Sequence, residues 1–148
     1  MKAAAGHPRS LWAATAPPPP QTTSLIGEQR CDVAVVGAGI TGLSTAIHLR
    51  ERGIGCTVLE AARIGWGGSG RNSGHVIPTL AQGDPDHLVA TLGEERGERM
   101  VGFIRDSANA TFDLIARHRI DCEAVYNGWA QPAHRPSRLK VLESRLAQ

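Results

Sequence analysis

Gly37, Gly39 and Gly42 have the spacing G-x-G-x-x-G, and Glu60 follows them along the chain. In that spacing the first glycine permits a tight turn, the second lets a pyrophosphate approach the backbone, and the third lets a helix pack close to a strand. The amides that open the helix favour negative charge. An acidic residue about 20 residues further on can accept hydrogen bonds from the two hydroxyls of an adenosine ribose. These four residues therefore predict a dinucleotide site.

The segment around these glycines has the pattern of a βαβ unit. Residues 31–36 are mostly apolar and rich in β-branched side chains, as in a buried parallel strand, and a second such run spans 56–59. Between them, Leu43, Ala46 and Ile47 place apolar side chains on one face of a helix. The strands, the helix and the terminal acid agree with one another. This agreement favours a Rossmann unit over an ordinary βαβ turn whose glycines serve only packing.

A second glycine-rich stretch follows Glu60. Five of the ten residues 65–74 are glycine, so several backbone amides could approach one ligand. Ser69, Arg71 and Asn72 add a hydroxyl, a fixed cation and an amide. In a plain NAD-binding dehydrogenase the chain would proceed into the next crossover helix, so this excursion predicts further contacts on the same dinucleotide. The alternative is a flexible surface loop with a solvated arginine.

The two glycine stretches resemble the amino-terminal part of the FAD-dependent amine and D-amino-acid oxidase superfamily, of the glycine/D-amino acid oxidase type. The resemblance is carried by VAVVGAGITGLSTAIHLRERG and VLEAARIGWGGSGRNSGHV. It is closest to the branch of gamma-glutamylputrescine oxidoreductase, and with the leader and the following helix it covers residues 10–148. Members of that family are much longer. The chain is therefore expected to be an amino-terminal part, apparently truncated.

The resemblance implies an FAD cofactor and hydride transfer to the flavin from a primary amine or amino acid. It places the pyrophosphate at the first glycine turn, the adenosine ribose at Glu60, and the pyrophosphate, ribityl chain or flavin ring along Ser69–Asn72. The residues it assigns to the cofactor are Gly37, Ala38, Gly39, Ile40, Thr41, Gly42, Glu60, Ala61, Ser69, Gly70, Arg71 and Asn72. No catalytic residue is assigned. A non-catalytic dinucleotide-binding fragment and an NAD-dependent dehydrogenase remain as alternatives.

The expected fold class is α/β, a Rossmann-type FAD-binding βαβ unit with the start of an α+β substrate domain. Residues 1–30 are expected to form an extended proline-rich arm, in which Trp12 either anchors on the folded body or is disordered. Residues 31–83 would form the FAD-binding unit with its loop. Residues 84–148 would begin the substrate domain.

The last of these segments predicts helices and one hairpin. Asp84 would cap a helix that runs from Pro85 to about Leu92. Residues 94–118 have the pattern of a long amphipathic helix. Its predicted buried face contains Met100, Phe103, Ile104, Ala108, Thr111, Leu114 and Ile115. Asn127–Gly128 predicts a hairpin turn between strands at 120–126 and 129–133. A last helix would open at Pro136 and Ser137, with apolar residues Leu139, Leu142 and Leu146.

The composition favours some classes of protein and disfavours others. With 41% hydrophobic and 20% charged residues and a net charge of +2, the sequence is typical of a soluble globular protein and gives no argument for a nucleic-acid partner. No apolar run approaches the roughly 20 residues needed to cross a bilayer, so a cytoplasmic location and no membrane partner are expected. The oligomeric state is open. Cys31 and Cys56 are expected as small apolar residues in buried strands, and no cysteine or histidine spacing predicts a metal site.

Overall fold

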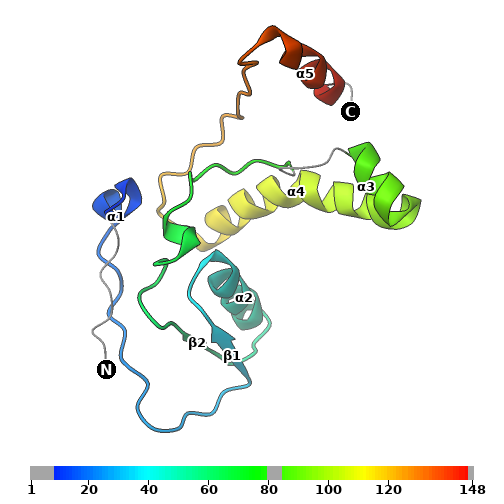
Figure 1. Cartoon of the computed structure of the whole chain (residues 1–148). Helices are drawn as coiled ribbons and strands as arrows, with labels where there is room; N and C mark the ends of the chain where they lie inside the picture. Colours follow the sequence, from blue (N-terminus) through cyan, green and yellow to red (C-terminus); the bar gives the residue numbers. More distant parts are fainter. Residues whose placement is uncertain (1–8, 80–84, 147–148) are drawn as a thin grey trace. The chain divides into compact units, whose positions relative to one another are not determined.

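A computed structural model describes residues 9–79 and 85–146, and the chain divides into two compact units, Met1–Gly74 and His75–Gln148. The elements of the first unit are α1 (Leu11–Thr15), β1 (Val33–Val36), α2 (Ile40–Glu51), β2 (Cys56–Leu59) and the 3-10 helix η1 (Gly68–Gly70). Those of the second unit are α3 (Pro85–Leu92), α4 (Glu94–His118), the 3-10 helix η2 (Pro136–Arg138) and α5 (Leu139–Leu146) (Figure 1).

The predicted βαβ unit is confirmed. β1 and β2 pair in parallel, with Val33 opposite Cys56 and Val36 opposite Leu59. α2 connects the two strands, as parallel neighbours require, and lies beside them (Figure 1). Its predicted inner face is also confirmed, because Ala46 is buried while its apolar neighbours on that face, Leu43 and Ile47, are half-buried.

The first strand is shorter than the sequence predicts. It begins at Val33, whose amide donates to the carbonyl oxygen of Gly55 at 3.1 Å. Just before it, the Asp32 carboxylate accepts a hydrogen bond from the Gly55 amide at 2.8 Å. The expected burial of Cys31 in the strand is therefore wrong: Cys31 precedes the ladder and is exposed.

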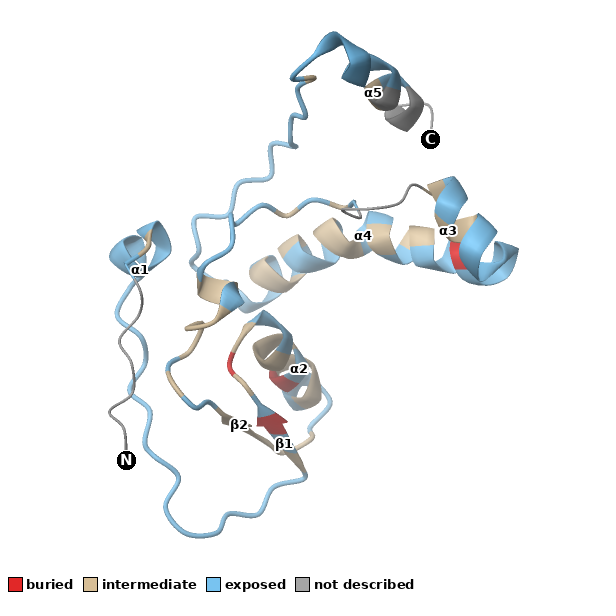
Figure 2. Cartoon of the chain, viewed as in Figure 1, coloured by how far each residue is buried: buried red, intermediate tan, exposed pale blue. Residues whose placement is uncertain are grey.

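β1 is also buried on one side only. Successive side chains of a strand point to opposite faces. Val35 is buried on the side of α2, where its Cγ1 lies close to Gly42, whereas Val36 is 86% exposed. In Figure 2, β1 is buried (red) in only one part of its length. Within the described part of this unit no layer covers the second face, so the expectation of a fully buried strand is wrong for Val36.

Part of the proline-rich arm is helical. In α1 the Ser10 hydroxyl caps the helix by accepting a hydrogen bond from the Ala13 amide at 3.1 Å. The helix ends at Thr15, and the next residue, Ala16, is extended because the residue before a proline such as Pro17 is pushed out of the helical region. The prediction of an extended arm is therefore wrong for Leu11–Thr15.

In the second unit, α3 folds back on the start of α4 (Figure 1). Gly93, with a φ of +80°, separates the two helices, and Gly97 is buried directly against the backbone of Val89. The bounds predicted for both helices are confirmed. The predicted cap at Asp84 lies outside the described residues.

The inner face of α4 follows from the position of Gly97. Positions three and four apart along a helix share a face. The half-buried positions on the face that Gly97 begins are Val101, Ile104, Ala108, Phe112 and Ile115. Ile104, Ala108, Leu114 and Ile115 of the predicted set are half-buried as expected. Burial of Met100, Phe103 and Thr111 was predicted wrongly, since these side chains are exposed, Phe103 by 74%.

We expect Gly97→Ala to lower the free energy of unfolding by about 1–3 kcal/mol, because the added Cβ would overlap the Cα of Val89 and push α3 away from α4. Gly102→Ala in the same helix is the control. Its Cβ meets only a terminal nitrogen of Arg105, at 3.8 Å, so helix propensity should raise stability by up to about 1 kcal/mol. Urea denaturation measures both, and equal stabilisation by the two substitutions would contradict the packing described.

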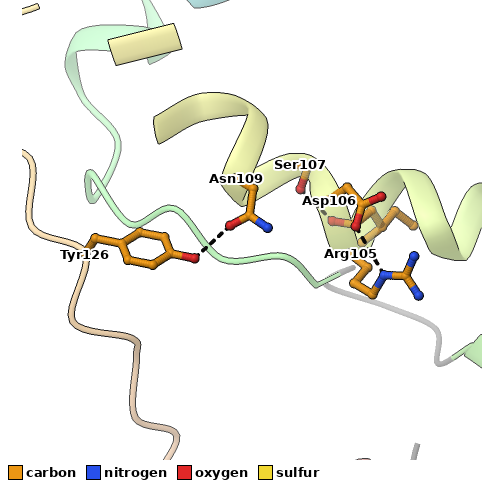
Figure 3. A network of polar contacts seen from close by, with 6 residues as sticks. Arg105, Asp106, Ser107, Asn109 and Tyr126 are labelled. Carbon is orange, nitrogen blue, oxygen red and sulfur yellow. Dashed lines mark hydrogen bonds and ion pairs between the residues drawn. The ribbon is translucent and has the colours of Figure 1, made fainter. Parts of the chain in front are cut away.

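The predicted hairpin at 120–133 is wrong, since the structure has no strand in these residues. Gly128 does adopt a positive φ of +76°, as a turn glycine would. The Tyr126 ring instead lies edge-on to that of Phe112 on α4, with ring centres 4.6 Å apart. The Tyr126 hydroxyl donates to Asn109 Oδ1 at 2.7 Å (Figure 3). An isolated two-stranded hairpin is marginally stable in water, whereas this contact ties the segment to α4.

The predicted last helix is confirmed, because η2 opens at Pro136 and continues into α5. Among the helices of residues 9–79 and 85–146, none combines the length and the apolar character needed to span a bilayer.

Candidate functional site

The glycine turn continues the ladder between β1 and β2. The amide of Gly37 donates to the carbonyl oxygen of Leu59 at 2.7 Å, and the φ of Gly37 is +98°, a conformation that favours glycine. In the first turn of α2, Gly42 packs directly on the carbonyl oxygen of Gly37, where a Cβ would have no room. The two glycines therefore occupy the geometries that the sequence predicts for them, a sharp turn and a close helix approach.

Glu60 leaves β2 beside this turn, and its carboxylate points at it. One oxygen, Oε2, accepts a hydrogen bond from the amide of Ala38 at 2.8 Å, and Oε1 accepts one from the amide of Ala62 at 2.8 Å. The amide of Ala38 first, and then those of Ala62 and Ala61, hold the pKa of Glu60 below its usual value of 4.5, although burial acts in the opposite direction. The side chain is exposed and is therefore an ionised acceptor at neutral pH.

The second glycine stretch is docked on the same turn. Ser69 Oγ accepts a hydrogen bond from the amide of Ile40, the first residue of α2, at 2.9 Å, and the amide of Gly65 donates to the carbonyl oxygen of Ala38 at 2.9 Å. A Cβ on Gly39 would lie 2.8 Å from Ser69 Oγ, so the glycine leaves room for this contact. The structure thus brings Ser69 to the first turn, and its contact with the dinucleotide stays a prediction. The sequence analysis did not anticipate the hydrogen bond from Gly65, which has a φ of +70°, to Ala38.

Arg71 and Asn72 use their side chains to hold the loop itself. The Asn72 amide nitrogen donates to the carbonyl oxygen of Ser69 at 2.9 Å, and its oxygen accepts a hydrogen bond from the Gly74 amide at 2.7 Å. Arg71 Nε donates to the carbonyl oxygen of Gly67 at 3.1 Å. Its guanidinium carbon lies 5.1 Å from the centre of the Trp66 ring, a cation–π contact that sequence reasoning did not anticipate.

The arm also reaches this loop. Trp12 Nε1 donates a hydrogen bond to the carbonyl oxygen of Asn72 at 2.6 Å, which confirms that Trp12 anchors the arm on the folded unit. The sequence indicated the residue but not the place where it binds.

This arrangement fits the adenosine diphosphate part of a dinucleotide. Gly39, the N-cap of α2, makes no side-chain bond to the helix, while the amide of Ile40 is bonded to Ser69 Oγ, whose hydroxyl proton can be donated onward. The exposed Glu60 carboxylate offers lone pairs beyond those used by the two amides. An anion site and an acceptor for hydroxyl groups thus lie side by side. Within residues 9–79 and 85–146, no three His, Cys, Asp or Glu side chains gather as metal ligands would.

A family model described as FAD dependent oxidoreductase (DAO) matches residues 32–148. The chain belongs to this family. The matched region contains both glycine stretches and Glu60, and it begins after Trp12. The family accounts for the Rossmann-like βαβ unit of the first half.

The curated relatives of the chain include a gamma-glutamylputrescine oxidoreductase, as the sequence analysis expects. Gamma-glutamylputrescine oxidoreductase of Escherichia coli (strain K12) is 37% identical over 117 residues, which are 79% of this chain and 27% of the relative. Probable oxidoreductase OrdL of Haemophilus influenzae is 34% identical over 95 residues, 64% of this chain and 22% of the relative. Probable oxidoreductase OrdL of Rhizobium meliloti is 32% identical over 114 residues, which are 77% of this chain and 26% of the relative. The chain spans about a quarter of the length of these curated relatives. No solved structure matches it significantly.

Proposed function

We propose that the chain is the FAD-binding part of an oxidoreductase that oxidises a primary amine or an amino acid. The observation that carries the cofactor assignment is the Glu60 carboxylate, held 2.8 Å from the amide of Ala38 inside the glycine turn. In this assignment Gly37–Gly42 meet the pyrophosphate and Glu60, with the adjacent Ala61, meets the adenosine ribose. Ser69–Asn72 extend along the pyrophosphate, the ribityl chain or the flavin ring.

Glu60 is suited to a ribose that carries two free hydroxyls. A carboxylate has about four lone-pair positions, so it can keep the amides of Ala38 and Ala62 and still accept two hydroxyl donors. Because the amides lower its pKa, the group stays charged at neutral pH. A 2′-phosphate in place of one hydroxyl would bring two negative charges together, which disfavours NADP.

Ser69 and the start of α2 are suited to the pyrophosphate. The Ser69 oxygen accepts from the Ile40 amide, so the hydroxyl proton can be donated to a phosphate oxygen. The partial positive charge at the N-terminus of α2 acts in the same direction. The absence of a Cβ at Gly39 allows phosphate and backbone to approach.

FAD, when bound, supplies the acceptor for a hydride from the substrate carbon that bears the amine. The residues of this chain bind and orient the cofactor, and none of them is assigned a proton-transfer role. The amine substrate is supported by the 37% identical E. coli relative, whose name specifies gamma-glutamylputrescine.

The site is tested by titrating the protein with FAD, ADP and FMN. We expect ADP to compete with FAD and FMN to compete poorly, because the first glycine turn and Glu60 address the adenosine half of FAD, which FMN lacks. Competition by FMN as strong as that by ADP would contradict this assignment of the site.

Anaerobic addition of primary amines to the FAD-loaded protein tests the substrate class. Loss of the visible flavin absorption is expected with amines or amino acids and not with the corresponding alcohols.

A further inference from the structure

One side chain of the arm docks on the glycine-rich loop. Besides its 2.6 Å hydrogen bond to the carbonyl oxygen of Asn72, the Trp12 indole lies against Gly74, where an added Cβ would be 3.1 Å from ring carbons Cζ2 and Cη2. Gly74 has a φ of +73°, which also favours glycine. Trp12 is 42% exposed whereas the adjacent Leu11 is 66% exposed, so the indole is the more covered of the two side chains.

The short helix α1 presents this indole. A helix of five residues is too short to be stable alone in water. Its N-terminus is capped by Ser10, and Thr15 Oγ1 donates to the carbonyl oxygen of Leu11 at 3.1 Å. Since these local bonds are exposed, the contact of Trp12 with the loop contributes to holding the helix, and the helix in turn fixes the indole.

Asn72 carries the contact from the arm to the cofactor site. Its carbonyl oxygen accepts the indole N–H, while its side chain bridges the carbonyl oxygen of Ser69 at 2.9 Å and the amide of Gly74 at 2.7 Å. Ser69 in turn accepts the hydrogen bond from the Ile40 amide at 2.9 Å. Two loop residues therefore link Trp12 to the first amide of α2.

We propose that Trp12 is a positioning residue for the cofactor loop, residues 65–74. It fixes the Asn72 carbonyl and Gly74, and through Asn72 it holds Ser69 at the start of α2. The family match begins at residue 32 and does not include Trp12. The inference rests on the proposed function, since it takes the loop to contact FAD beyond the part shared with ADP.

The first measurement needs no cofactor. Hydrogen exchange followed by mass spectrometry reports how well the amides of residues 65–74 are protected in the full chain. We expect Trp12→Ala to speed their exchange by about threefold to tenfold, the effect of losing one hydrogen bond and its packing. Trp12→Phe keeps a ring against Gly74 but has no N–H, so its effect should be intermediate. Leu11→Ala, on the same helix, is the control and should leave the exchange unchanged.

The second measurement compares the affinities of FAD and ADP. We expect Trp12→Ala to weaken FAD binding by about threefold to tenfold and ADP binding less, because Ser69 addresses the pyrophosphate that both ligands contain whereas the rest of the loop addresses only FAD. General unfolding would weaken the binding of both ligands equally. Unchanged exchange in Trp12→Ala would overturn the inference. Faster exchange with an unchanged ratio of FAD to ADP affinity would also overturn it. If the wild-type protein bound no FAD, the proposed function would fail, and the exchange measurement would still decide whether Trp12 holds the loop.

Discussion

Gly42→Ala is expected to abolish tight FAD binding. The Cβ of an alanine at this position would overlap the carbonyl oxygen of Gly37 and lie 3.3 Å from Cγ1 of Val35. Backbone cannot give way as a flexible side chain can, so α2 must move away from β1 or the turn must change its conformation. Either movement takes the first amides of the helix away from the phosphates. Losing two amide bonds to a charged group should weaken FAD binding by about a hundredfold or more.

Gly68→Ala is the matched control for this substitution. Gly68 belongs to the same candidate site, but it opens the 3-10 helix η1, a Cβ there meets no atom within 4 Å, and its φ is not in the left-handed region. FAD affinity measured by fluorescence quenching should remain close to that of the wild type. Overpacking by Gly42→Ala should also lower the free energy of unfolding by about 1–3 kcal/mol. Retention of wild-type FAD affinity in Gly42→Ala would show that the turn does not hold the phosphates.

Glu60→Gln is expected to weaken FAD and ADP binding alike, by about tenfold or more, because charge-assisted hydrogen bonds to the ribose become neutral ones. Glutamine also has only one oxygen, so it cannot accept hydrogen bonds from Ala38 and Ala62 at two separate oxygens as the carboxylate does. The control is Asp32→Asn. That carboxylate accepts the amide of Gly55 at the opposite end of the strand pair, so its loss should affect stability without weakening FAD binding selectively. Equal affinities for ADP in wild type and Glu60→Gln would remove Glu60 from the ribose site.

The pH dependence of binding gives a second test of Glu60. Its pKa in the folded protein is lowered, so the contribution of the carboxylate to stability and binding is fully present above the usual value of 4.5. It is lost only as the pH falls below 4.5, through the lower folded pKa. Binding measured from neutral pH down to 4.5 should therefore show no loss from this group, and the additional loss below 4.5 should be absent in Glu60→Gln.

The parts of the site that sequence alone predicts are those set by local backbone geometry. The conformation of Gly37 and the close approach of Gly42 follow from one strand, one turn and one helix, whose signals lie in adjacent residues. The direction of Glu60 follows from the parallel pairing of the second strand, which the βαβ pattern predicts. The contacts of Ser69 with Ile40 and of Trp12 with Asn72 join residues far apart in the sequence. No periodicity or turn signal specifies such pairs, so their geometry could be found only in the structure.

The errors of the sequence analysis have the same origin. The Asn127–Gly128 signal predicts a turn, and Gly128 does have a positive φ, but whether the flanking residues pair depends on what else they contact. Tyr126 contacts α4 instead. Likewise, the apolar run that includes Cys31 and Val36 indicates a strand, whereas its burial depends on layers that the run itself does not encode.

The register of the two parallel strands has a consequence for how such a site can change during evolution. Val36 lies opposite Leu59, so the glycine turn and Glu60 leave the sheet at the same level. Insertion or deletion of one residue in β2 would turn the Glu60 side chain to the other face of the sheet, because side chains alternate with a period of two. These strands should therefore tolerate point substitutions but not insertions or deletions. Single-residue insertions and deletions should be confined to the turn at residues 53–55 and to the arm before Asp32.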